Sequence, residues 1–167
     1  MTEEAGTEPI IREVRIGASP ETVFAFFTDP EKLTRWLCEE AAVDPRPGGV
    51  NRQRHPGEAG DPDGTYVICS RFVEVSPPSR LVFTWGYEDP GVGVPSGSST
   101  VEVTLEPDGE GTLLRLVHRD LLGPELVPHG GGWDRALERL AAAATGDSGP
   151  RTGLATRPTG PPQRNRP

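Results

Sequence analysis

The sequence predicts an α+β domain in which a curved antiparallel sheet of six or seven strands wraps around a long C-terminal helix. Three observations predict it. A strand pattern over residues 10–16 leads directly into signals for two short helices. About six further segments alternate apolar and polar residues and are separated by turns rich in proline and glycine. Apolar residues then recur at helical spacing from Trp133 to Ala144.

The first strand and the two short helices come from local signals. Residues 10–16 alternate between apolar and charged side chains, as a strand with one buried face does. Ser19 is suited to an N-cap, and Pro20 to the first helical position that follows it. Thr28-Asp29-Pro30 ends this helix and caps a second one over residues 31–37.

The middle of the chain predicts a meander of six strands. Their expected ranges are 41–44, 50–55, 65–75, 80–87, 99–105 and 112–119. The strand at 50–55 is polar and is expected to be largely exposed. Alternation in the last three strands assigns one set of side chains to the concave face. These are Leu81, Phe83, Trp85, Val101, Val103, Leu105, Leu114, Leu116 and His118.

A sheet with this few strands cannot close on itself, so its concave face needs a cover. After a linker at 120–129, the helix expected from about Gly131 to Ala144 has one apolar stripe that suits this role. The stripe is bulky at Trp133 and Leu137 and otherwise small, as at Ala141. Small residues opposite large apolar walls leave space, and we therefore expect a binding cavity between helix and sheet.

Composition sets the expected limits of the domain. Residues 147–167 contain five prolines, three glycines and four arginines and are predicted to be a disordered tail. Residues 1–9 are expected to be a flexible N-terminus, so the domain spans residues 10–146.

Charge and hydropathy exclude several classes of function. The net charge is −8 and the isoelectric point is near 4.9, which disfavours nucleic acid as a partner. No apolar run approaches the roughly 20 residues of a membrane-spanning helix, so no membrane insertion is expected. The acidic N-terminus is unlike a secretory signal, which predicts a cytoplasmic location. Cys38 and Cys69 fit no zinc pattern, and no metal or cofactor is expected.

Several segments in order along residues 10–145 resemble one known superfamily. They are Arg12–Ile16, Ser19–Phe24, Thr28–Leu33, Arg35-Trp36, Val43–Gly49, Pro78–Trp85, Val101–Leu105, Leu114–His118 and Gly132-Trp133. Together they resemble the START-like, or SRPBCC, superfamily and are most similar to homologues of the heat-shock chaperone ATPase activator. The resemblance implies the helix-grip fold. In relatives two adjacent tryptophans often end the second helix, whereas here Leu37 follows Trp36.

The candidate site is the cavity of this fold. The side chains expected to bind a ligand there are Trp85, His118, Trp133, Leu116, Val103, Phe83, Leu137 and Trp36. His118 could exchange a proton with a ligand, or it could be a strand-end histidine bonded to Asp120 or to the backbone. His129 precedes three glycines that form either a gate or a frayed helix start. His55 is assigned no role.

Three functions remain open. The leading one is a non-enzymatic domain that binds a hydrophobic or aromatic small molecule between the sheet and the last helix. The second is an enzyme similar to polyketide cyclases and aromatases, with His118 as the proton-transfer group. The third is a protein-interaction module that acts on a chaperone, and the partners left open are a chaperone or a second copy of the chain. An open apolar cavity favours small-molecule binding, and a filled cavity with an exposed apolar patch favours the protein-interaction module.

Overall fold

The computed structural model describes residues 8–56, 65–89, 94–121 and 123–147. The expected tail lies outside these ranges except for Asp147, and so does most of the expected flexible N-terminus.

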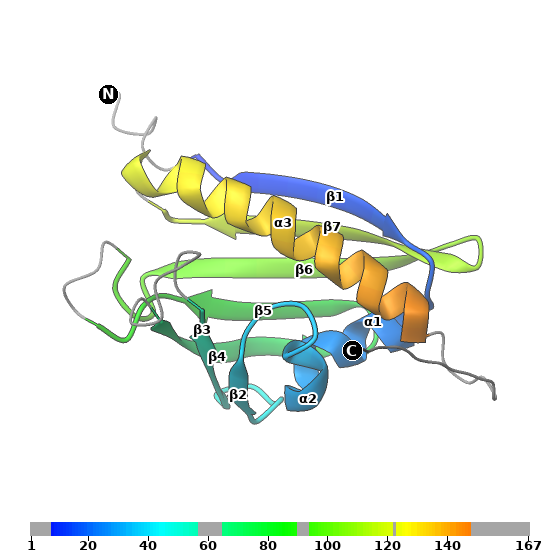
Figure 1. Ribbon diagram of the computed structural model, residues 1–167, viewed down its shortest axis with the longest axis horizontal. Coiled ribbons are helices and arrows are strands. Elements are labelled where there is room, and N and C mark those ends of the chain that lie inside the picture. The colour runs from blue at the N-terminus through cyan, green and yellow to red at the C-terminus, as the bar shows by residue number, and fades with distance from the viewer. Residues whose placement is uncertain (1–7, 57–64, 90–93, 122, 148–167) are drawn as a thin grey trace, which may run out of the picture.

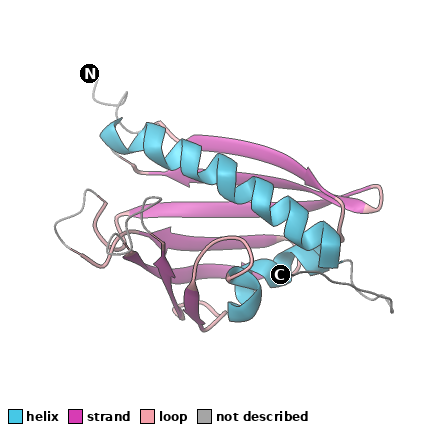
Figure 2. Ribbon diagram, in the orientation of Figure 1, coloured by secondary structure: helices cyan, strands magenta, loops and turns pink. Residues whose placement is uncertain are grey.

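Seven strands form one antiparallel sheet (Figures 1 and 2). They are β1 (Ile10–Ile16), β2 (Glu40–Val43), β3 (Val50–His55), β4 (Tyr66–Ser76), β5 (Arg80–Trp85), β6 (Ser99–Asp108) and β7 (Gly111–Arg119). The order across the sheet is β1-β7-β6-β5-β4-β3-β2, so each strand from β2 to β7 lies beside the next one along the chain. The predicted meander and the helix-grip fold are confirmed, with β1 added beside β7.

The two short helices begin as their capping residues predict. Helix α1 (Pro20–Thr28) starts after Ser19, whose hydroxyl accepts a hydrogen bond from the amide of Thr22. Helix α2 (Pro30–Leu33) starts after Asp29 in the same way. It is shorter than the predicted 31–37, because beyond Leu33 the chain continues as turns rather than as helix.

The long helix α3 (Gly123–Asp147) crosses one face of the sheet (Figure 1) and begins about eight residues earlier than predicted. The prolines and glycines of residues 120–129 are typical of a linker, which is why the sequence predicts a later start. Pro124 lies in the first turn, where a missing N–H costs nothing, and Pro128 removes a single helical hydrogen bond. Asp120 makes the turn from β7 with a positive φ of 72°.

A single core joins α1, α2, the sheet and α3. The apolar stripe of α3 is buried as predicted at Trp133, Ala136, Leu137, Leu140 and Ala144. These side chains pack with the inward residues of β5, β6 and β7, so α3 lies on the same face of the sheet as α1.

Strand β3 differs from its prediction, because alternate polar side chains point inward instead of being exposed. Asn51, Gln53 and His55 are all buried. The Gln53 amide donates to Asn51 Oδ1 at 3.0 Å, and His55 Nε2 lies 2.8 Å from Gln53 Oε1. Because each polar group finds a partner along the strand, the buried ladder avoids the cost of unpaired polar atoms.

Candidate functional site

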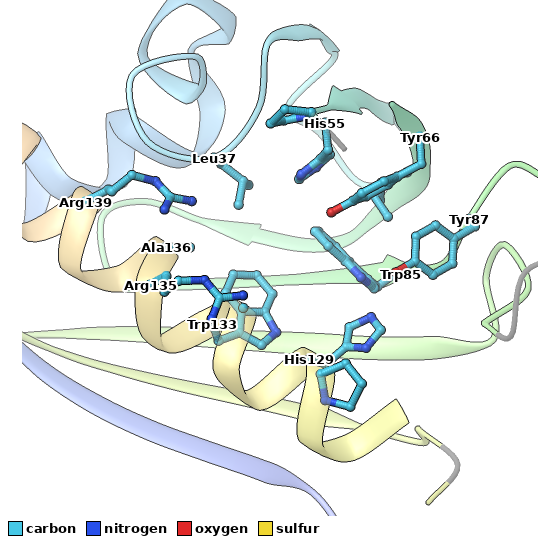
Figure 3. A pocket seen from close by; sticks show the side chains of 14 residues that line it. Leu37, His55, Tyr66, Trp85, Tyr87, His129, Trp133, Arg135, Ala136 and Arg139 are labelled. Atoms are coloured by element: carbon cyan, nitrogen blue, oxygen red, sulfur yellow. The ribbon is translucent and has the colours of Figure 1, made fainter. Parts of the chain in front are cut away.

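A pocket of about 510 Å³ lies between residues 128–139 of α3 and the ends of β3, β4 and β5 (Figure 3). Its walls are Leu37, His55, Pro56, Tyr66, Ile68, Trp85, Tyr87, Pro128, His129, Gly132, Trp133, Arg135, Ala136 and Arg139.

Aromatic rings from both sides of the pocket contact one another in its wall. Trp85 on β5 and Trp133 on α3 have ring centroids 5.3 Å apart. His55 stacks on Tyr66 at 5.2 Å with an interplanar angle of 10°, and Tyr66 meets Tyr87 edge-on at the same distance. His55 also meets Trp85 edge-on, which joins these contacts into one wall.

Tyr87 reaches this wall although it lies just beyond β5. Its amide donates to the carbonyl of Val94 at 2.7 Å, and it forms an isolated bridge with Ile68 on β4. Its ring also lies 6.1 Å from that of His129 on α3, so Tyr87 connects the sheet to the helix. Burial is the main reason that the pKa of its phenol rises to about 12, and the group is therefore neutral at pH 7.

Two arginines supply the formal charge of the wall at neutral pH. Arg135 and Arg139 lie one turn apart on α3, and both line the pocket (Figure 3). Arg139 Nε donates to the carbonyl of Trp36 at 2.9 Å, which holds its guanidinium beside the pocket. No aspartate or glutamate occurs among the described residues of the wall.

The two pocket histidines are neutral at pH 7. Burial, together with the nearby charge of Arg139, lowers the pKa of His55 to about 4. Burial also lowers the pKa of His129, although Glu125 opposes this shift through its carbonyl and its carboxylate. Positive charge in the pocket therefore comes from the arginines and not from imidazolium groups.

The indole N–H of Trp85 is a buried donor with no hydrogen-bond partner in the described part of the chain. Trp133, which faces it, donates its own N–H to His118 Nδ1 at 3.0 Å. Within the described part of the chain, the wall thus has a donor without an acceptor, and such an unpaired buried donor costs free energy unless a ligand supplies the acceptor.

His118 lies behind the two tryptophans and does not line the pocket, contrary to where the sequence analysis placed it. It has no exposed surface. Because Nδ1 accepts from Trp133, the ring proton sits on Nε2 and is donated to Ser99 Oγ at 2.9 Å. Ser99 in turn donates to the carbonyl of Trp85. Burial, together with His129, lowers the pKa of His118 to about 3, so the ring is a neutral link between the two tryptophans.

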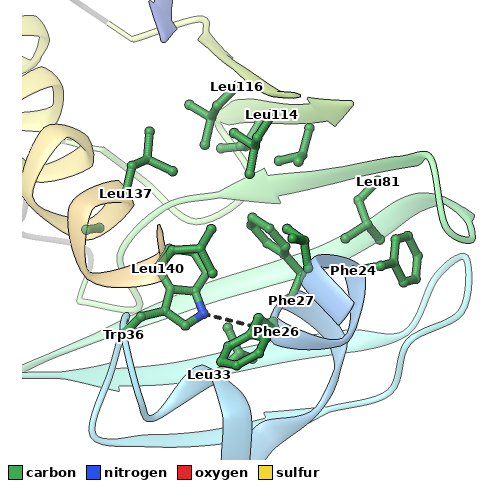
Figure 4. Close-up of a cluster of buried hydrophobic side chains, with 14 of the residues drawn as sticks. Phe24, Phe26, Phe27, Leu33, Trp36, Leu81, Leu114, Leu116, Leu137 and Leu140 are labelled. Atoms are coloured by element: carbon green, nitrogen blue, oxygen red, sulfur yellow. Dashed lines mark hydrogen bonds between the residues drawn. The ribbon is translucent and has the colours of Figure 1, made fainter. Parts of the chain in front are cut away.

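Of the other predicted ligand-binding residues, Trp85 and Trp133 line the pocket and the rest lie in the core (Figure 4). Phe83, Val103, Leu116 and Leu137 are buried among the side chains that α3 packs against. Trp36 packs edge-on against Phe27, and its N–H donates to the carbonyl of Phe26 at 2.9 Å. The side of α3 that carries Leu137 packs closely there, and the pocket lies instead along the side that carries Trp133, Ala136 and Arg139.

Several wall residues were missed from the sequence. Alternation with Asn51 and Gln53 could have placed His55 on the inward face of its strand. The arginine pair could have been noticed as two like charges at positions i and i+4 beside the apolar stripe. Tyr66 and Tyr87 carried no such signal, because their positions depend on how β4 meets the chain after β5.

Neither a membrane span nor a metal site emerges from the part of the chain that the structure describes. Its helices are all too short or too polar to cross a bilayer. Its histidines, cysteines and acidic residues form no group of three or more that could hold a metal ion.

Comparison with known proteins gives one family. Residues 17–145 match the family described as Activator of Hsp90 ATPase homolog 1-like protein. The search of curated proteins found no match.

Solved structures with the same fold include three informative examples. The solution structure of an AHSA1-like protein from Rhizobium etli is 38% identical, with 90% of this chain and 91% of that chain covered and a TM-score of 0.64. CalU16 from Micromonospora echinospora is 30% identical over 83% of this chain and 77% of its own, with a TM-score of 0.62. DynU16, a protein of the dynemicin biosynthetic locus, is 22% identical over 80% of this chain and 46% of its own, with a TM-score of 0.65, and shows the fold alone.

Proposed function

The chain belongs to the family of Activator of Hsp90 ATPase homolog 1-like proteins, and within that family we propose that it binds an aromatic small molecule in the pocket between β3–β5 and α3. The observation that carries the proposal is the pocket itself. Its volume of about 510 Å³ lies in the range of small-molecule sites, roughly 300–1,000 Å³. Six of its wall residues have aromatic rings, which favour flat, apolar ligands.

Binding is better supported than proton transfer by His118. Both ring nitrogens of His118 already have partners, and the side chain is inaccessible. A general base needs a free nitrogen within reach of the ligand and a pKa near the working pH. His118 has no free nitrogen, and its pKa of about 3 is far below neutral pH.

A small-molecule site is also better supported than a protein-docking face. Among the described residues, Ile11 and Val73 are the most exposed large hydrophobic side chains. Ile11 lies on β1 and Val73 on β4, with three strands between them in the sheet. Ile11 and Val73 therefore do not belong to one contiguous apolar patch of the kind that marks an interaction surface.

Calorimetric titration with 2-naphthamide, a neutral bicyclic aromatic, tests the proposal. We expect saturable binding with one site per chain. The variant Ala136→Leu should weaken binding at least several-fold, because Ala136 lines the pocket and is buried. The control is Ala142→Leu, the same change at an exposed position of the same helix, which should bind as the parent does.

Lack of saturable binding, or equal weakening by both variants, would contradict the proposal. Where binding is saturable and Ala136→Leu alone weakens it, native mass spectrometry of the protein purified from its own host would identify the natural ligand.

A further inference from the structure

We propose that the ligand is an aromatic acid, whose anionic group is bound by Arg135 and Arg139 while its ring lies against the aromatic wall. The inference rests on the proposed function and adds the chemical class of the ligand. It starts from an asymmetry in the pocket, whose formal charges are all positive, although residues 1–146 carry a net charge of −11.

The two guanidinium groups are placed to act together. Arg135 and Arg139 are separated by one helical turn, so their side chains extend from the same face of α3. Like charges at this spacing repel each other and destabilise a helix slightly. A bound carboxylate would remove that repulsion, and the forked geometry of arginine suits it.

The protein itself does not neutralise this pair. Arg135 has no hydrogen bond or ion pair within the described part of the chain, and the only partner of Arg139 there is the uncharged carbonyl of Trp36. Asp134, the acid beside Arg135 in sequence, pairs instead with Arg12 at 2.6 Å. The carboxylate of Glu125 lies 3.6 Å from His129.

The excess of acids elsewhere on the domain does not oppose local binding strongly. At physiological ionic strength, exposed charges are screened over about 8 Å, so distant carboxylates have little effect at the pocket. A ligand anion in direct contact with the two guanidinium groups would lie well within that screening distance and would accept charge-assisted hydrogen bonds from them.

The remaining unmatched polar group in the wall is also a donor. Trp85 Nε1 is buried without a partner in the described residues. The phenol of Tyr87 and the two pocket histidines are neutral at pH 7, as their shifted pKa values indicate. The wall therefore provides positive charge and hydrogen-bond donors beside aromatic surface, which is complementary to a flat anion rich in acceptors.

The experiment compares two probes of nearly equal shape, 2-naphthoate and its neutral analogue 2-naphthamide, by calorimetry at pH 7.5 and 0.15 M salt. We expect the acid to bind about tenfold more tightly than the amide. Octanoate, with the same charge but no ring, should bind more weakly than 2-naphthoate.

Arginine variants test whether Arg135 and Arg139 cause the preference for 2-naphthoate over 2-naphthamide. Arg135→Gln and Arg135→Gln/Arg139→Gln should lower the affinity for 2-naphthoate stepwise to that for 2-naphthamide and leave the amide affinity within about twofold. The control is Arg115→Gln, which removes an exposed arginine on β7 outside the pocket and should leave both affinities unchanged.

The outcomes separate this inference from the proposed function. Equal affinity for acid and amide, or equal loss with Arg115→Gln, would overturn the aromatic acid but leave an aromatic site. Tighter binding of octanoate than of 2-naphthoate would also overturn the aromatic acid and would indicate an aliphatic acid as the ligand. Failure of both naphthalene probes to bind would overturn both proposals together.

Discussion

His118 connects the two tryptophans of the pocket through a chain of buried hydrogen bonds. It accepts from Trp133 on α3 and donates to Ser99 on β6, which donates to the carbonyl of Trp85 on β5. Three elements are thereby held in one relative position by a side chain that does not touch the pocket. His118 therefore acts indirectly, because it fixes the positions of Trp85 and Trp133 in the pocket wall.

Replacing His118 with leucine should destabilise the fold. The change leaves the buried Trp133 N–H without an acceptor, which costs about 1–3 kcal/mol, whereas Ser99 loses one contact but still donates to the carbonyl of Trp85. Urea denaturation at pH 7.5 measures the loss. The matched control, Leu116→Ile, changes a buried shape two residues away on β7 without removing a hydrogen bond and should cost less. A leucine variant as stable as the parent would contradict the assigned role.

Stability should fall with acid before the carboxylates titrate. His118 and His55 have pKa values of about 3 and about 4 in the folded chain, against about 6.5 when unfolded. Between these values the unfolded state binds protons that the folded state cannot, so stability is complete above pH 6.5 and decreases below it. Each histidine should contribute a loss of about 2 kcal/mol between pH 7.5 and pH 5.

Urea denaturation across this pH range checks the prediction. The variant His55→Gln should show a shallower dependence, because it removes one of the histidines whose pKa is lowered while keeping a polar side chain beside Gln53. A flat profile for the parent chain between pH 7.5 and pH 5 would contradict the buried neutral state of both rings.

At the scale of the element, α3 performs two tasks with different parts of its length. Its C-terminal half closes the core with Leu137, Leu140 and Ala144, all at most 4% exposed. Its residues from Pro128 to Arg139, including Trp133 and Ala136, form one side of the pocket. From the sequence alone, the small residues of the stripe are all expected to face the cavity. In the structure, Ala136 lines the pocket and Ala144 lies in the filled core.

Leucine at two alanine positions of α3 should therefore affect stability to different extents. Ala136→Leu extends into the pocket and should change the free energy of unfolding by less than about 1 kcal/mol. Ala144→Leu enters a filled core, where overpacking costs about 1–3 kcal/mol. Thermal and urea denaturation of the two variants, side by side, measure the difference. An equal loss at both positions would mean that the pocket is as closely packed as the core.

Ala141 illustrates the same distinction. The sequence analysis placed it on the stripe that faces the cavity. It is only partly buried, packs at the edge of the core and does not line the pocket. The useful position for occluding the site is Ala136, more than one turn earlier on the helix.

At the scale of the whole molecule, the described core is complete within the predicted domain. Its buried hydrophobic residues lie between Ile10 and Ala144, and the last helix ends at Asp147. The family match, residues 17–145, falls within the same limits.

A chain that ends at Asp147 should accordingly melt within one or two degrees of the full-length chain. No side chain of the described core is removed, and the composition of residues 148–167 offers one large apolar residue, Leu154. Differential scanning calorimetry of the two chains measures the difference. A drop of about ten degrees would show that the segment contributes to stability and would move the domain limit.

The sequence by itself determined the fold class, because that depends on patterns local in the chain. Alternation in the strands, the caps at Ser19 and Asp29, and the single stripe of α3 each act within a few residues, and together they allow one layered arrangement. Two helix limits were misplaced. Helix α2 ends at Leu33 rather than at residue 37, and α3 begins earlier than predicted, since prolines in its first two turns are also typical of a loop.

The pocket was decided by the tertiary structure. Alternation tells which face of a strand a residue is on, but not how far along the sheet the crossing helix leaves space. That distance separates Trp85 and Trp133, which line the pocket, from Leu116 and Leu137, which share their faces but lie in the core. His118 was placed on the correct face for the same reason, yet its role depends on Trp133, fifteen residues away, and that pairing exists only once α3 has packed on the sheet.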